Sequence, residues 1–245
     1  MQAKIKLIGL AYLILVRSIL CAQDTDSDLL TKGQELYDQE KYTEASEIFT
    51  GLLETDPGNN NIRYFLANSL LGEGKYEKAI KQYSKIIRKD PGYVEAYFNR
   101  GNAWYEMFYF KKAITDMNRV LKANPDDGAA LSVRGSAWFN LDAFEKALTD
   151  FTRVVDLLPD SASAHYDLGN ALFMRKKYEE AVLEYTTAID LDPGISDYYF
   201  NRALAGFYLD MATDACADLE KAASLGDEEA GAYLEEFCGQ AEEVQ

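Results

Sequence analysis

Side chains that could do chemistry are few in this chain of 245 residues. It contains one histidine, His165, and three cysteines. A structural zinc site needs about four cysteine, histidine or acidic ligands brought together, so this inventory predicts no metal site. We expect His165 to be a packing residue, because equivalent segments of the chain carry Tyr97, Leu131 and Tyr199 there. No cofactor is expected.

Phosphate binding and catalysis are also not indicated. Residues 72–75 read Gly-Glu-Gly-Lys, but they fall at a predicted turn between two helices and lack the preceding strand of a nucleotide-binding loop. Acidic residues are abundant but scattered, and no nucleophile, base and orienting group share a spacing that suggests catalysis. The sequence predicts a protein without enzymatic activity, and no small-molecule substrate is evident.

A recurring pair of opposite charges is the clearest chemical signal. Where arginine occupies one position of a repeating unit, aspartate follows 16 residues later. Where that first position is Leu66 or Leu168, the later residue is Gln82 or Glu184. A guanidinium fork matches a carboxylate, so we predict structural ion pairs within the repeat; the alternative is a line of arginines that binds an acidic ligand. The three pairs are Arg100 with Asp116, Arg134 with Asp150, and Arg202 with Asp218.

The elements that position these side chains are helix pairs repeated along the chain. Residues 94–127 hold two amphipathic helical patterns separated by a short break. Residues 128–161 repeat this plan 34 residues later, and such a fixed period is typical of helical-repeat proteins. Gly101, Trp104, Ala113 and Pro125 recur as Gly135, Trp138, Ala147 and Pro159.

Aligned in this way, the chain divides into six units, and we predict an all-α fold. An aromatic residue begins the second helix of the first five units, and a proline ends each of them because it cannot continue a helix. The sixth unit has Asp227 in place of that proline. The predicted units are 26–59, 60–93, 94–127, 128–161, 162–195 and 196–227, followed by a capping helix at 228–241 and a frayed tail at 242–245.

This pattern resembles the tetratricopeptide repeat (TPR). The resemblance implies a right-handed superhelical solenoid of stacked antiparallel helix pairs, with first helices lining a concave groove. Amides there could bond a peptide backbone, and aromatic rings could hold anchor side chains; alternatively, the rings pack between repeats and the amides only solvate the helices. The groove residues implied are Tyr64, Asn68, Phe98, Asn99, Asn102, Tyr105, Ser136, Phe139, Tyr166, Asp167, Asn170, Phe173 and Asn201.

The resemblance implies a non-catalytic scaffold that binds an extended protein segment. Acidic residues near the amides favour neutral-to-basic segments. An alternative is a structural or assembly factor that docks through an acidic convex face or the terminal helix. The co-chaperone form of the family is disfavoured, because its groove needs cations where this chain has Tyr64, Ala129 and Val133.

Net charge and the N-terminus restrict partners and location. The net charge of −16 argues against binding to nucleic acid or to an anionic membrane surface. Lys4 and Lys6 precede an apolar run at 7–16, a pattern typical of a signal peptide spanning 1–22 and cleaved after Ala22. We therefore expect an exported protein, periplasmic or extracellular; the alternative is that residues 5–22 are retained as a membrane anchor.

Export also bears on the cysteines. After cleavage only Cys216 and Cys238 remain, and they are equidistant from position 227, in the turn before the capping helix. Residues equidistant from a turn come level in an antiparallel helix pair. In an oxidising compartment we predict a disulfide between them; the alternative is two buried thiols.

Overall fold

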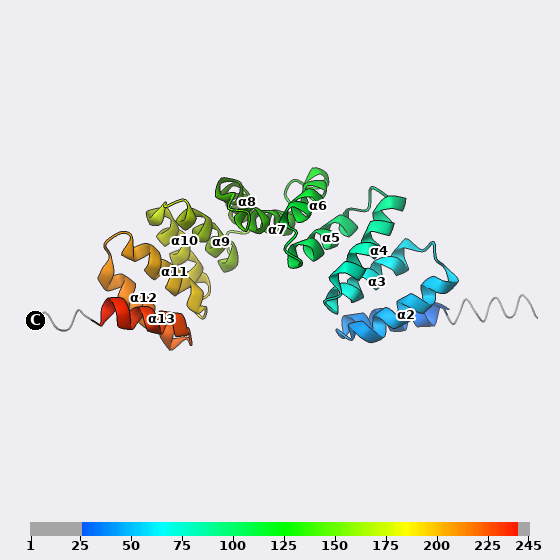
Figure 1. The fold of residues 1–245 in the computed structure, drawn as a ribbon, viewed down its shortest axis with the longest axis horizontal. Helices are drawn as coiled ribbons and strands as arrows, with labels where there is room; N and C mark the ends of the chain where they lie inside the picture. Colours follow the sequence, from blue (N-terminus) through cyan, green and yellow to red (C-terminus); the bar gives the residue numbers. More distant parts are fainter. Residues whose placement is uncertain (1–25, 240–245) are drawn as a thin grey trace, which may run out of the picture. The chain divides into compact units, whose positions relative to one another are not determined.

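The computed structural model describes residues 26–239, and every regular element in that range is helical (Figure 1). The all-α prediction is therefore confirmed. The proposed signal segment and the C-terminal tail lie outside the described residues. After a helical segment at 26–38 come α2 (Tyr42–Thr55), α3 (Asn60–Gly72), α4 (Tyr76–Lys89), α5 (Val94–Glu106), α6 (Phe110–Ala123), α7 (Gly128–Phe139), α8 (Phe144–Leu157), α9 (Ala162–Met174), α10 (Tyr178–Leu191), α11 (Ser196–Phe207), α12 (Ala212–Ser224), α13 (Glu228–Tyr233) and η1 (Leu234–Cys238).

A left-handed residue closes the turn inside every hairpin. In the second hairpin, Lys75 N donates to Leu70 O at 2.8 Å, and Gly74 has a φ of 73°. Such a residue satisfies the last carbonyls of a helix and stops it. Two positions later the next helix begins. The other turns use non-glycine residues with φ between 56° and 61°, namely Glu40, Phe108, Asp142, Lys176 and Asp210.

Close approach of the two helices explains the small residue in each first helix. A methyl group added to Gly135 would lie 2.7 Å from the ring of Phe151, and one added to Gly169 would lie 2.6 Å from the ring of Tyr185. Both rings are almost fully buried. Glycine therefore makes room for a large aromatic side chain from the second helix, and burial of such a ring is among the larger apolar contributions to stability.

The helices form two compact units, unit 1 ending at Met107 and unit 2 beginning at Phe108. In unit 1, Phe49, Tyr83 and Ile86 lie in one core cluster and are fully buried. In unit 2, separate clusters surround Tyr185 and Leu219. Each cluster joins side chains from successive hairpins, because a single hairpin cannot cover its own apolar face.

The end of the chain differs from the single capping helix predicted. Asp227 accepts a hydrogen bond from Ala230 N at 2.9 Å, so it caps α13 where earlier units have proline. After six residues the α-helix gives way to the π-helical turn η1. Gly239 N donates to Leu234 O across five residues at 3.1 Å, and Leu234 and Cys238 pack against the last core cluster.

Candidate functional site

In unit 1, two amides and a tyrosine of the first helices form a hydrogen-bonded cluster with a tyrosine of the second helix α4. Asn99 Nδ2 on α5 donates to Tyr64 Oη at 2.9 Å and to Asn68 Oδ1 at 3.0 Å, both on α3. Asn68 Oδ1 also accepts from Tyr83 Oη at 2.6 Å. The carbonyl oxygen of Asn68 is thus already used by two donors inside the protein.

The same cluster recurs in unit 2. Asn201 Nδ2 on α11 donates to Tyr166 Oη at 2.8 Å and to Asn170 Oδ1 at 3.2 Å, both on α9. Tyr185 Oη donates to Asn170 Oδ1 at 2.8 Å. Burial raises the pKa of Tyr185, as it does that of Tyr83, so both phenols stay neutral donors.

Two other predicted groove positions keep their polar groups unused. Among residues 26–239, no side-chain hydrogen bond involves Asn102 on α5 or the hydroxyl of Ser136 on α7, and both are half-buried. The predicted line of amides therefore contains two kinds of site. Asn68 and Asn170 organise the helices, whereas Asn102 and Ser136 have free bonding capacity.

The predicted aromatic positions also separate into different roles. Phe139 packs edge-on against Phe144 at 5.3 Å between ring centres, and Phe173 packs against Tyr178 at 5.4 Å. Phe173 also packs against Tyr208 of the next hairpin, at 5.7 Å between ring centres, so both rings belong to the packing of the helices. The ring of Tyr166, at the amide cluster of unit 2, packs against the ring of Tyr198 with 4.9 Å between ring centres. Phe98 and Tyr105 lie half-buried on α5.

Asp167 on α9 is a carboxylate without a partner among the described residues. Burial raises its pKa from 3.8 to about 6. Removing a carboxylate from water without a compensating charge is unfavourable, and a perturbed titrating group marks a candidate binding position.

The predicted arginine–aspartate spacing gives two-bond ion pairs in unit 2. Arg134 Nε and Nη2 donate to Asp150 at 2.8 and 2.7 Å, and Arg202 makes the same two bonds to Asp218, each at 2.7 Å. The remaining Nη1 of Arg134 donates to Asn118 on the preceding hairpin. These contacts occupy the guanidinium fork and join neighbouring hairpins.

The third predicted pair falls across the two units. Arg100 lies on α5 in unit 1, where its Nη1 donates to Ser84 Oγ at 3.0 Å, and Asp116 lies on α6 in unit 2. Their pairing remains a prediction.

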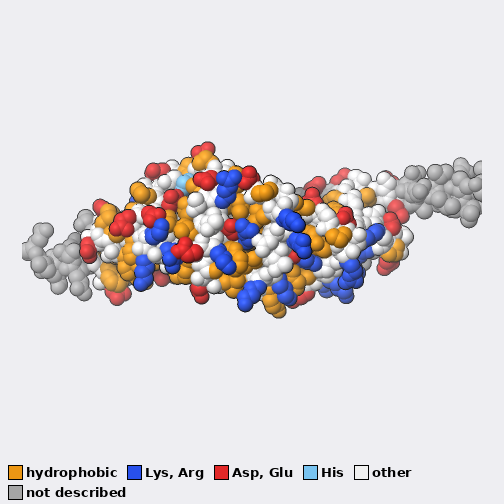
Figure 2. Space-filling view, turned by 90° about the horizontal axis from the view of Figure 1, so that it is seen from above, with side chains coloured by type: hydrophobic (Ala, Val, Ile, Leu, Met, Phe, Trp, Pro, Cys, Tyr) orange, Lys and Arg blue, Asp and Glu red, His pale blue; other side chains and the backbone are white. Residues whose placement is uncertain are grey.

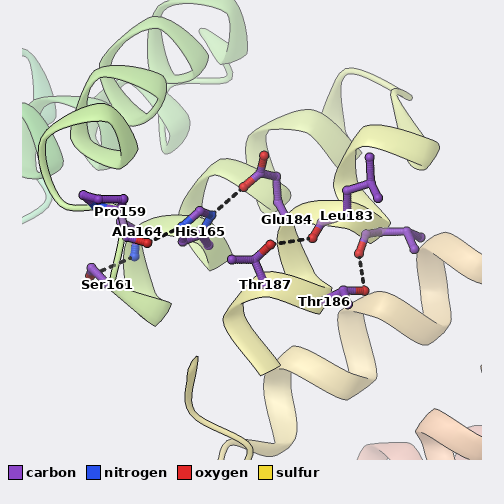
Figure 3. Close-up of polar contacts among 9 residues, drawn as sticks. Pro159, Ser161, Ala164, His165, Leu183, Glu184, Thr186 and Thr187 are labelled. Atoms are coloured by element: carbon purple, nitrogen blue, oxygen red, sulfur yellow. Dashed lines mark hydrogen bonds and ion pairs between the residues drawn. The ribbon is translucent and has the colours of Figure 1, made fainter. Parts of the chain in front are cut away.

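In the second and fifth hairpins, Leu66 and Leu168 stand at the arginine position. Sequence reasoning did not predict which side chain takes over the bonding role of arginine in these hairpins. His165 Nδ1 lies 2.7 Å from Glu184 Oε2, and Nε2 lies 2.9 Å from the carbonyl of Pro159 (Figure 3). In the second hairpin Arg63 bonds Gln82 and the carbonyl of Pro57 in the same way. In both hairpins the side chain that makes these bonds stands three residues before the leucine that replaces arginine. The single histidine is therefore a buried polar bridge rather than an apolar packing residue.

The cysteines come together at the last helices. Cys216 on α12 and Cys238 in η1 have Cα atoms 5.9 Å apart, within the range for a disulfide. The π-helical turn thus carries Cys238 onto α12.

Within residues 26–239, no three histidine, cysteine or acidic side chains are grouped to hold a metal ion. Nor does that range contain a helix with the length and apolarity needed to cross a bilayer.

Comparison with known sequences agrees with the repeated helix pairs. The sequence profile of the tetratricopeptide repeat matches residues 30–93, 66–106 and 141–196, and a second profile of the same repeat matches residues 94–127. The chain belongs to the tetratricopeptide-repeat family. No curated protein matches the TPR chain significantly.

Several solved TPR structures share the fold. The TPR protein YrrB aligns with a TM-score of 0.68 and 23% identity, over 78% of this chain and 99% of its own. A TPR protein from Parabacteroides merdae aligns with a TM-score of 0.72 and 22% identity, over 86% of this chain and 88% of its own. MamA from Desulfovibrio magneticus aligns with a TM-score of 0.66 and 23% identity, over 68% of this chain and 94% of its own. TPR folds are typical of protein–protein interaction scaffolds, and proteins or peptides are the usual kind of partner.

Proposed function

We propose that this TPR chain is a non-catalytic scaffold that binds an extended protein segment along its first helices. The observation that carries the proposal is a free polar group on a first helix of each unit, the amide of Asn102 in unit 1 and the hydroxyl of Ser136 in unit 2. A free amide can donate to and accept from a peptide backbone, and a hydroxyl can do the same. Such contacts hold a backbone without selecting its sequence.

The organised amide clusters support this role indirectly. In each unit they fix a tyrosine ring of a first helix, Tyr64 on α3 in unit 1 and Tyr166 on α9 in unit 2. A ring held in place loses little conformational freedom when it contacts a ligand, which favours aromatic side chains as anchors. YrrB, which is similar in fold, is described as having an unusual peptide-binding site.

Charge favours neutral-to-basic segments. Asp167 offers an unpaired carboxylate on α9 of unit 2, and Asp197 lies exposed on the next first helix, α11. In unit 1, Glu95 and Glu106 lie exposed on α5. Attraction between these carboxylates and a basic segment would weaken with salt.

An array of 12-residue peptides with different net charges tests the proposal. The variant Asn102→Ala/Ser136→Ala should weaken capture of neutral and basic peptides, because two backbone contacts are lost. The control is Thr115→Ala/Thr149→Ala, whose hydroxyls bond only to the preceding helical turn on exposed second-helix faces. Equal losses in both variants, or strong capture of acidic peptides that compete with the basic ones, would count against this site.

We also propose that the protein is exported, on the signal-like pattern at 1–22, with retention of 5–22 as an anchor as the alternative. Export would expose Cys216 and Cys238 to an oxidising environment, and their Cα separation suits a bond between them.

A further inference from the structure

A basic helix stands out in this acidic protein. The exposed side of α4 carries Lys78, Lys81, Lys85, Arg88 and Lys89, and Glu77 is the helix's single acidic residue. The corresponding second helix α10 of unit 2 instead carries four acidic residues and no cation. The repeat therefore does not require a basic helix at this place.

The cations of α4 border two adjoining hollows in unit 1. A cleft of about 660 Å³ lies between α2 and α4, with Leu66 and Leu70 among its lining residues and Lys78, Lys81 and Lys85 along one side. A second hollow of about 430 Å³ is lined by Arg63, Lys85, Arg88 and Lys89 and by no carboxylate. Lys85 lines both hollows, so they adjoin along α4, and we call the two together the α4 cleft.

These cations are not neutralised within the part of the chain that the structure describes. No ion pair there involves Lys78, Lys81, Lys85 or Arg88. Arg63 bonds only the neutral groups of Gln82 and Pro57.

Mutual repulsion among these side chains is evident at Lys85. Burial, followed by the charges of Arg63, Lys81 and Arg88, lowers the pKa of the Lys85 amine. Like charges held together are unfavourable, and an anionic ligand would relieve that repulsion. Figure 2 shows lysine and arginine side chains along the lower right edge, on the side where unit 1 is drawn.

We propose that the α4 cleft binds an acidic segment of another protein, at a site separate from the first-helix face. With a rise of 1.5 Å per residue, the cations from Lys78 to Lys89 extend over roughly 16 Å, about the length of five extended residues. Apolar side chains of the segment would contact Leu66 and Leu70 while its carboxylates meet the lysines.

An acidic segment fits better than an anionic membrane. Glu47 and Glu54 of α2 line the opposite side of the same cleft. A bilayer surface would press against both sides and meet these carboxylates. A single extended chain can lie against α4 alone.

Fluorescence anisotropy with a labelled 12-residue peptide of alternating Glu and Leu tests the proposal on the full chain. We expect binding that weakens with salt and that falls about tenfold in Lys81→Glu/Lys85→Glu. The matched control Lys111→Glu/Lys122→Glu changes the net charge equally on exposed positions of α6 and should bind like the wild type. The variant Asn102→Ala/Ser136→Ala should also bind normally, which separates this site from the first-helix site.

Three outcomes would overturn the proposal. The peptide could fail to bind, or both charge reversals could weaken binding equally, which would indicate a general charge effect. Alternatively, vesicles of phosphatidylglycerol and phosphatidylcholine could bind through Lys81 and Lys85 while the peptide does not, which would assign the cleft to a membrane surface. Circular dichroism of both charge variants establishes that they remain folded.

Discussion

Asp167 should make the folded protein less stable as pH rises. Its pKa is raised by burial from 3.8 to about 6, so the folded state disfavours the charged form. The nearby charged and titrating groups are Asp197, Tyr166 and Tyr198, none of which supplies a positive charge. The stability that the neutral acid gives the folded state is fully present below pH 4 and is lost as pH rises through 6.

The size of this effect follows from the shift. One pKa unit corresponds to about 1.4 kcal/mol, so the ionised carboxylate costs about 2–3 kcal/mol at pH 8. Asparagine has a similar shape and no charge to desolvate. Asp167→Asn should therefore raise the free energy of unfolding by about 2–3 kcal/mol at pH 8 and change it little at pH 4.

Urea unfolding at pH 4, 6 and 8 measures this difference. Asp190→Asn, on an exposed position of α10, is a control that removes a solvated carboxylate. If the Asp167→Asn variant were only as stable as the wild type at pH 8, or less stable, the carboxylate would be hydrated or paired. That result would refute the reasoning.

The same variant also tests the binding role of the carboxylate. Asp167→Asn should weaken binding of basic peptides and leave neutral peptides unaffected, so that stability is gained while selectivity for positive charge is lost.

Three further predictions follow from the contacts in unit 2 and from the N-terminus. Asp150→Ala should destabilise the protein by roughly 3–5 kcal/mol, because it strands Arg134, and Arg134→Leu/Asp150→Leu should recover much of the loss; single and double variants that both melt at the wild-type temperature would show that the pair has little weight. Reduction of a Cys216–Cys238 bond, which closes a 22-residue separation, should lower stability by roughly 3 kcal/mol, and two alkylatable thiols in unreduced native protein would exclude the bond. Mass analysis of native protein should find a mature N-terminus near Gln23, and an intact initiator methionine in the cytoplasm would contradict export.

Much of the fold could be read from spacing. The aromatic residues Tyr42, Tyr76, Phe110, Phe144 and Tyr178 begin second helices, because the turn before them has a fixed length. The interval between Arg134 and Asp150 likewise predicts that these two side chains face one another across one hairpin. The repeat period and the spacing of opposite charges can be counted along the chain, so the sequence displays both directly.

Other features depend on partners that spacing does not reveal. Tyr83 and Tyr185 are buried in the core, and their hydroxyls reach the amides of the first helices. The bridge from His165 to Glu184 requires knowledge of which side chains meet across a hairpin. The cations of α4 are present in the sequence, but the negative net charge of the whole chain does not reveal this local excess of positive charge.

The amide cluster of Asn68 and Asn99 occurs again as Asn170 and Asn201, three repeats further along the chain. If the tyrosine ring that each cluster holds, Tyr64 in unit 1 and Tyr166 in unit 2, makes a similar contact, one molecule offers two equivalent attachment points. A partner that carries the recognised segment twice would bind the second copy at a high effective concentration, and its overall affinity could exceed that of one segment by about 10²–10⁴-fold. A partner with one copy would exchange rapidly. The repetition would thus select partners by valency, through the number of segments they carry.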